Sequence, residues 1–145
     1  MKILLRAAVI CTLVRCDGWV SHAEAVDRVA NGAFTARLEQ SINDYRAQQR
    51  LPKLKREQNL ADLAVEHSVQ MAKAGRLSHE GFVARVERSG HRMCVENVGW
   101  NYPTPDAQMK GWQQSVGHDT NLRDARVASM GVGVSEGYVT FIACD

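Results

Sequence analysis

The sequence predicts an α+β fold, in which helices flank a small three-stranded antiparallel sheet. Two β-rich runs, 130–134 and 138–144, are separated by Ser135-Glu136-Gly137, a pattern typical of a hairpin. A third strand is expected over 94–100, where β-branched and aromatic residues flank an acidic residue. The apolar stripe over 58–74 is broad, which indicates a helix that packs on more than one neighbour.

An earlier helix is expected from Phe34 to the segment before Pro52. Apolar residues recur there at helical spacing: Phe34, Leu38, Ile42 and Tyr45. The residue before a proline avoids the α region, so the helix should end near Arg50. A left-handed cap conformation at Arg50 would cost about 1 kcal/mol, because the residue is not glycine.

Two shorter helices are expected on either side of the strand at 94–100. The first covers 82–89, with inward and outward sets assigned as follows: Phe82, Val83 and Val86 inward, Arg85, Glu87 and Arg88 outward. The second begins with Thr104 as N-cap, ends at Gly117, and is followed directly by His118. Its expected apolar face consists of Met109, Trp112 and Val116.

The N-terminal residues 1–25 have the features of a secretory signal peptide. A basic start precedes a short apolar stretch, and Ala23-Glu24-Ala25 fits a cleavage site. The apolar stretch is too short to span a bilayer, so the mature chain should lack a transmembrane segment. Residues 26–33 are then a lead-in, 34–145 form the domain, and the protein is secreted or periplasmic. A membrane-associated or poorly ordered N-terminus is the alternative.

Charge argues against one class of function, and the cysteine content predicts a disulfide. Without residues 1–25 the net charge falls from +2 to +1, because three basic and two acidic residues are removed. That balance argues against an electrostatic nucleic-acid binder. Only Cys94 and Cys144 remain, and export with an even count favours a disulfide over free thiols or metal ligands. Such a bond stabilises by at most about 4 kcal/mol.

Glu96 is the most unusual residue of the predicted sheet. A carboxylate inside an apolar run is costly unless a charged or hydrogen-bonding group meets it. His79 and His118 are the two candidates for that role. His67 has Met71 at its i+4 position and is therefore expected to be a core histidine, or one that supports the site indirectly, and not a metal ligand.

The order of several short motifs resembles the bacterial branch of the CAP superfamily, also called SCP-like extracellular proteins. The motifs are Asn43-x-x-Arg46, Leu51-Pro52, Glu96-Asn97, Trp112, Gly117-His118-x-x-Asn121 and Met130-Gly131-Val132-Gly133. The resemblance implies an α-β-α sandwich. It also implies a cleft where two histidines and two acids can hold a divalent metal.

By this resemblance His79 and His118 correspond to the two histidines and Glu96 to the first acid, whereas Ser115 occupies the position of the second acid. Two imidazoles and a carboxylate are a plausible ligand set for zinc with an open position for water. A metal-free hydrogen-bonded cluster, or a purely core role, explains the same residues. Asn97 and Asn121 are expected to satisfy backbone groups.

The function expected from the resemblance is a secreted binding or interaction module, with a lipid, peptide or cell-wall component as its unknown ligand. One alternative is a zinc-dependent hydrolase in which Glu96 acts as base or third ligand and the metal lowers the pKa of bound water. Another is a structural surface protein with a vestigial cleft. No nucleophile-elbow pattern surrounds Ser115, which argues against a serine hydrolase.

Overall fold

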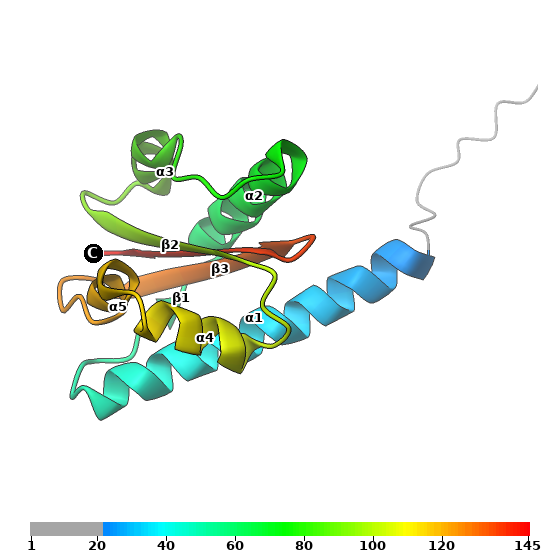
Figure 1. Ribbon diagram of the computed structural model, residues 1–145. Coiled ribbons are helices and arrows are strands. Elements are labelled where there is room, and N and C mark those ends of the chain that lie inside the picture. Colours follow the sequence, from blue (N-terminus) through cyan, green and yellow to red (C-terminus); the bar gives the residue numbers. More distant parts are fainter. Residues whose placement is uncertain (1–21) are drawn as a thin grey trace, which may run out of the picture.

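The computed structural model describes residues 22–145, so the predicted signal peptide lies outside the described residues up to position 21. A four-stranded sheet lies between two layers of helices (Figure 1). The elements are α1 (His22–Gln48), β1 (Lys55–Arg56), α2 (Gln58–Ala74), α3 (Phe82–Ser89), β2 (Cys94–Trp100), α4 (Pro105–Gln113), α5 (Val116–Leu122), β3 (Ser129–Ser135) and β4 (Tyr138–Cys144). Helices α2 and α3 cover one face, and α1, α4 and α5 the other.

The sheet has the strand order β1-β3-β4-β2. Strands β3 and β4 form the predicted hairpin, whose turn residues Glu136 and Gly137 both have positive φ, 47° and 78°. β2 pairs antiparallel with β4 along its whole length. The prediction of three strands is wrong by one, because β1 contains only Lys55 and Arg56 and pairs parallel with β3. Two exposed basic residues carry no alternating apolar signal.

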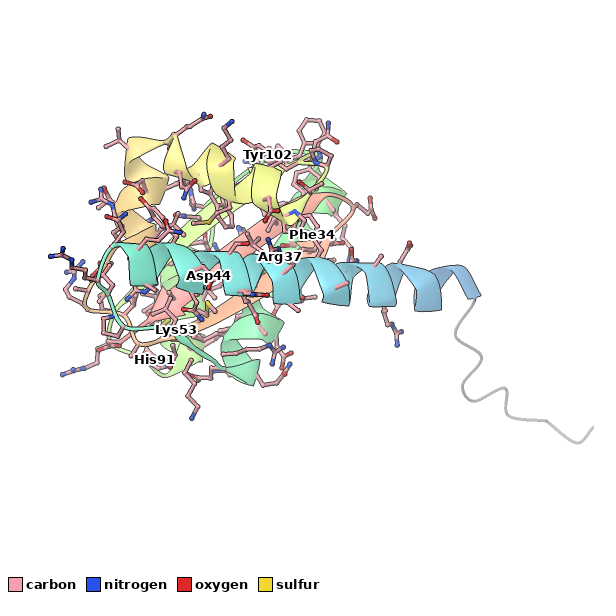
Figure 2. All side chains as sticks on the ribbon, turned by 90° about the horizontal axis from the view of Figure 1, so that it is seen from below. Phe34, Arg37, Asp44, Lys53, His91 and Tyr102 are labelled. Atoms are coloured by element: carbon pink, nitrogen blue, oxygen red, sulfur yellow. A yellow bond between two sulfur atoms is a disulfide. The ribbon has the colours of Figure 1, made fainter. Side chains whose placement is uncertain are left out.

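Helix α1 is longer than expected, since it begins at His22 and not at Phe34. The expected lead-in at 26–33 is therefore helical, and the helix ahead of Phe34 extends beyond the body of the domain (Figure 2). The segment contains Asn31-Gly32, but the helix continues through it. A glycine in an exposed helix interior costs only about 1 kcal/mol, and the alanines around it favour the helix.

The C-terminal corner of α1 is built around Arg46, which is fully buried. Its Nε donates to the carbonyl of Pro52, and its Nη1 donates to the carbonyls of Leu122 and Asp124, each at 2.9 Å. Arg50 has φ 61°, so the left-handed cap is confirmed. These contacts tie the end of α1 to the segment that follows it and to the distant segment at the end of α5.

Helices α4 and α5 replace the single helix that was expected up to Gly117. Ser115 is extended (φ −101°, ψ 115°) and separates them, and His118 lies inside α5 and not after a helix. Val116, assigned to the apolar face, is 86% exposed. Gly117 falls in the first turn of α5, where backbone N–H groups have no helical partner in any case and a glycine is therefore tolerated.

Two glycines allow α2 to pack directly on β3. A Cβ on Gly131 would lie 2.1 Å from the backbone nitrogen of Ala61, and one on Gly133 would lie 2.1 Å from that of Val65. Any side chain there would push the helix off the sheet. The motif Gly131-Val132-Gly133 therefore has a packing role, with Val132 directed to the opposite core.

The predicted disulfide between Cys94 and Cys144 is confirmed. The two cysteines are opposite each other at the ends of β2 and β4, and both are buried. The bond ties β2, an edge strand, to the centre of the sheet. It therefore fixes the strand that carries Glu96.

Candidate functional site

Glu96 projects from β2 toward the layer formed by α2 and α3, and it is only 5% exposed. Arg85 of α3 meets it with two parallel hydrogen bonds. Its Nε donates to Oε2 at 2.7 Å, and its Nη2 donates to Oε1 at 2.8 Å. Bidentate, charge-assisted pairs of this kind are strong and fix both side chains. The buried carboxylate thus has its cation in Arg85.

His79 lies in the loop between α2 and α3 and is the second partner of Glu96. Its Nδ1 lies 2.9 Å from Oε1, and a carboxylate only accepts, so Nδ1 carries the proton. The side chain is 53% exposed. The carboxylate therefore fixes the orientation of a ring that solvent still reaches.

His118 approaches from the opposite layer, on α5. Its pKa lies below its ordinary value, first because of partial burial and second because of the charge of His79. The two histidines are therefore close enough to repel each other when protonated. The ring of His118 packs edge-on against Trp112, with centroids 6.5 Å apart.

The open edge of β2 is covered by side chains from α4 and α5. Asn121 donates to the carbonyl of Glu96 at 3.1 Å and to Oδ1 of Asn97 at 2.9 Å. Trp112 Nε1 donates to the carbonyl of Val98 at 2.9 Å, and Asn97 donates to the carbonyl of His118 at 3.0 Å. This confirms that the two asparagines satisfy backbone groups, and it protects an edge strand from pairing with another chain.

A zinc centre with Glu96 as a ligand does not fit this arrangement. Both carboxylate oxygens accept hydrogen bonds from Arg85, and one also accepts from His79. Within residues 22–145 no group of three or more histidine, cysteine or acidic side chains is arranged to hold a metal ion. Ser115 stands at the position of the family's second acid and supplies no carboxylate, so only His79 and His118 are left as ligands. A divalent ion held by these two histidines stays a prediction.

Two residues of α3 differ from the prediction, Arg85 and Val83. Arg85 was placed on the outer side of the helix, yet it is 5% exposed, whereas Val83 was placed on the inner side and is 71% exposed. The buried side of α3 is formed at i, i+3, i+4 and i+7 by Phe82, Arg85, Val86 and Ser89. Arg85 could have been assigned to the buried side from this helical spacing and from the need of the buried Glu96 carboxylate for a cation.

The nearest sizeable cavity lies behind the loop that carries His79, between α2 and residues 75–81, and has a volume of about 370 Å³. Its lining includes Ser78 and Glu80, the two chain neighbours of His79. His67 lines it as well, and this ring is 2% exposed, as expected for a core histidine. His79 itself contacts Glu96, whereas its two chain neighbours line this cavity.

A sequence model described as "CAP: Cysteine-rich secretory protein family" matches residues 40–145. The chain belongs to this CAP family. Its fold is also similar to a solved extracellular protein containing an SCP domain from Bacillus anthracis, with a TM-score of 0.79 and 24% identity over 88% of the chain. A cysteine-rich secretory protein from Staphylococcus aureus follows with a TM-score of 0.72 and 19% identity over 79% of the chain.

Among curated proteins, this CAP chain is similar to the uncharacterized membrane protein YlbC of Bacillus subtilis, with 31% identity over 105 residues. Those residues are 68% of the chain and 30% of YlbC. The chain likewise covers 44% of the Bacillus anthracis protein and 38% of the Staphylococcus aureus protein. None of the helices in residues 22–145 combines the length and apolar character needed to cross a membrane.

Proposed function

We propose that this CAP domain is an extracellular binding module that holds its ligand at His79 and His118. The observation that carries the proposal is the Arg85–Glu96 pair, which fixes the inner nitrogen of a half-exposed imidazole. Buried charged pairs are expensive to form and are not explained by stability alone. Here the pair orients a ring that is open to solvent.

The orientation of His79 suggests the class of ligand. With its Nδ1 proton donated to Glu96, the neutral ring offers a lone pair at Nε2. A ligand that brings O–H or N–H donors meets this requirement, as peptides and cell-wall glycans do, whereas the hydrocarbon part of a lipid does not. We therefore favour a peptide or a cell-wall component as the ligand.

The alternative of a zinc-dependent hydrolase has less support. Glu96 would have to act as base or ligand, but Arg85 already neutralises its carboxylate. A general base must lie within reach of the proton that it removes, and Glu96 is only 5% exposed. The structural alternative, a domain with a vestigial site, would leave the exposure of His79 without a role.

Binding of a peptidoglycan fragment, a disaccharide tetrapeptide, tests the proposal by calorimetry. His79→Ala and His118→Ala should each weaken binding at least about tenfold, while each changes the free energy of unfolding by less than about 1 kcal/mol. Lys53→Ala is the control, because Lys53 is exposed in the segment between α1 and α2 (Figure 2). Unchanged binding in both histidine variants would show that the ligand does not bind at His79 and His118.

Zinc titration distinguishes a metal site at the two histidines from a metal-free recognition site. If the two imidazoles ligate zinc, affinity should fall as the pH drops below about 6.5, because a ligating imidazole must be neutral. Zinc binding of the wild type should then be lost in His118→Ala. Absence of zinc binding in the wild type would end the hydrolase alternative and leave a metal-free recognition site.

An extracellular location agrees with the names of the relatives, which include an extracellular protein and an outer surface protein from Borrelia burgdorferi. We expect cleavage after Ala25 during export, which N-terminal sequencing of the exported protein detects. A lipid-modified start at Cys16 would instead show a membrane anchor.

A further inference from the structure

Trp100 is a large aromatic residue that the fold leaves half in solvent at the end of β2. It is 51% exposed, whereas Glu96 and Val98, which precede it on the same face of the strand, are 5% and 6% exposed. Val98 packs with Met71 of α2 in a buried cluster. The cover of this face of β2 therefore ends between Val98 and Trp100.

One face of the Trp100 indole is held by a second ring. Trp100 and Tyr138 are opposite each other in β2 and β4, and their rings stack with centroids 5.8 Å apart and planes inclined by 29°. Next to the pair, the N–H of Asn101 donates to the carbonyl of Gly137 at 3.0 Å, which ties the end of β2 to the hairpin turn. The indole is thus fixed before a ligand arrives, which lowers the entropic cost of binding.

The other face of the indole is turned away from the sheet. β2 is the last strand in the order β1-β3-β4-β2, so β4 lies on one side of it and no described strand lies on the other. Because Tyr138 belongs to β4, it covers the inner face of the indole and leaves the outer face toward the open edge.

Both histidines of the proposed binding site also adjoin β2. His79 contacts Glu96 of this strand, and α5, which carries His118, packs against it. Four residues of a strand span about 13 Å, so the backbone positions of Glu96 and Trp100 are separated by roughly the length of a short oligosaccharide. One extended ligand along β2 can therefore reach the histidines and the indole together.

The chemistry of the indole face selects the part of the ligand that it contacts. The axial C–H groups of a pyranose form a flat apolar face, and their partial positive charge complements the negative face of an aromatic ring. The hydroxyl groups at the rim of the sugar remain free to meet water or polar side chains. A flexible peptide backbone offers no comparable rigid face.

We propose that Trp100 makes the site selective for a glycan, because a sugar ring of the ligand held at His79 and His118 stacks on the outer face of its indole. The inference rests on the function proposed above. It assigns recognition to the sugar chain of the cell-wall ligand and not to its peptide.

Calorimetry with the full chain and the tetrasaccharide of the peptidoglycan backbone, which carries no peptide, tests the inference. Trp100→Leu keeps apolar bulk without a flat ring and should bind about tenfold more weakly, whereas Trp100→Phe should retain most of the affinity. Tyr102→Leu is the matched control, since Tyr102 is also an exposed aromatic residue (39%) but lies against Gly111 of α4. Equal affinity of the wild type and Trp100→Leu would overturn the role of Trp100.

A measurement on the wild type does not depend on the folding of any variant. Sugar protons above an indole face experience its ring current, so their NMR signals should move upfield on binding, and the indole N–H signal of Trp100 should shift with them. Both shifts should persist in Tyr102→Leu. A tetrasaccharide that does not bind, or that binds without these shifts, would contradict the stacking contact.

The histidine variants distinguish this inference from the proposed function. If His79→Ala and His118→Ala weaken binding of the disaccharide tetrapeptide while Trp100→Leu leaves the affinity for the tetrasaccharide unchanged, the glycan inference fails and the proposed function stands. If Trp100→Leu weakens binding of the tetrasaccharide while both histidine variants bind it normally, the site at the histidines fails and the sugar contact at Trp100 stands.

Discussion

Arg46 and Arg85 are both buried, yet the domain uses them differently. Arg46 donates to the backbone carbonyls of Pro52, Leu122 and Asp124. Arg85 donates to a side chain, the carboxylate of Glu96. Backbone partners are fixed by the fold, so the corner around Arg46 holds the chain in place.

The centre around Arg85 differs because the partner of the arginine is a side chain that makes a further contact. A carboxylate has about four lone-pair positions, and the guanidinium occupies two of them. A third is used by His79, whose ring is half exposed. The difference between the two buried arginines is thus that Glu96 also orients an imidazole that solvent reaches, as the proposed binding site requires. At the Arg46 corner the constraint ends at the backbone.

Arg46→Met should give the largest loss of stability, about 4 kcal/mol. Three carbonyls lose their donor, and each buried unsatisfied group costs about 1–3 kcal/mol, partly relieved by water. Urea unfolding measures the change. Arg126→Met is the control, since Arg126 is 72% exposed and its ion pair with Asp124, screened by solvent, should contribute little to stability. Equal losses in the two variants would show that Arg46 is not a structural centre.

Glu96→Gln should cost about 3 kcal/mol, because Arg85 is left buried without its counter-charge. Replacing both residues, as Arg85→Met with Glu96→Leu, should restore most of this stability, since apolar pairs often substitute for buried ion pairs. The double variant should still fail to bind the peptidoglycan fragment, because His79 loses its anchor. A double variant that is stable and binds normally would contradict the positioning role of the pair.

Local signals in the sequence were enough for much of the fold. Gly75 and Gly90 end α2 and α3 where expected, and the hairpin follows from its turn residues. The break between α4 and α5 has no comparable signal, because Ser115 is an ordinary residue in an extended conformation. Helix packing over the β2 edge decides that break, and one sequence does not reveal it.

In the candidate site, too, one contact was predictable from the sequence and another was not. The contact between His79 and Glu96 was predicted because a carboxylate in a strand needs a partner. Arg85 was missed because a charged residue on a short helix normally faces solvent. Only the packing of α3 against β2 shows that its guanidinium is turned inward. Tertiary contacts therefore decide which of several nearby charges becomes the partner.

Arg50→Gly should stabilise the domain by about 1 kcal/mol or less. Arg50 has φ 61° at the end of α1, and Leu51 donates its N–H to the carbonyl of Arg46 in the pattern of a Schellman cap. Glycine relieves the left-handed strain, although its greater freedom in the unfolded chain offsets part of the gain. Thermal unfolding measures this change. A loss of stability would show that the side chain of Arg50 contributes a contact that outweighs the strain.

The smallest expected effect is the pH dependence of the free energy of unfolding that comes from His118. The pKa of His118 is lowered in the folded state, so below about pH 6.5 the unfolded chain binds more protons at this residue. Its contribution to stability is therefore complete above that pH and is lost as the pH falls toward the folded pKa. Because the ring is partly exposed, solvent screening keeps the contribution below about 1 kcal/mol.

Unfolding of wild type and His118→Gln at pH 7.5 and pH 5 measures this contribution of His118 to stability, and the variant should lose less stability on acidification.

Burial is the larger cause of the lowered pKa of His118, and the charge of His79 is the smaller cause. His79→Gln should therefore raise the pKa of His118 only part of the way to its ordinary value, which an NMR titration of the ring detects. A pKa of His118 that does not move in His79→Gln would mean that the two imidazoles do not share one site. The arrangement around Arg85 would then resemble the purely structural corner around Arg46.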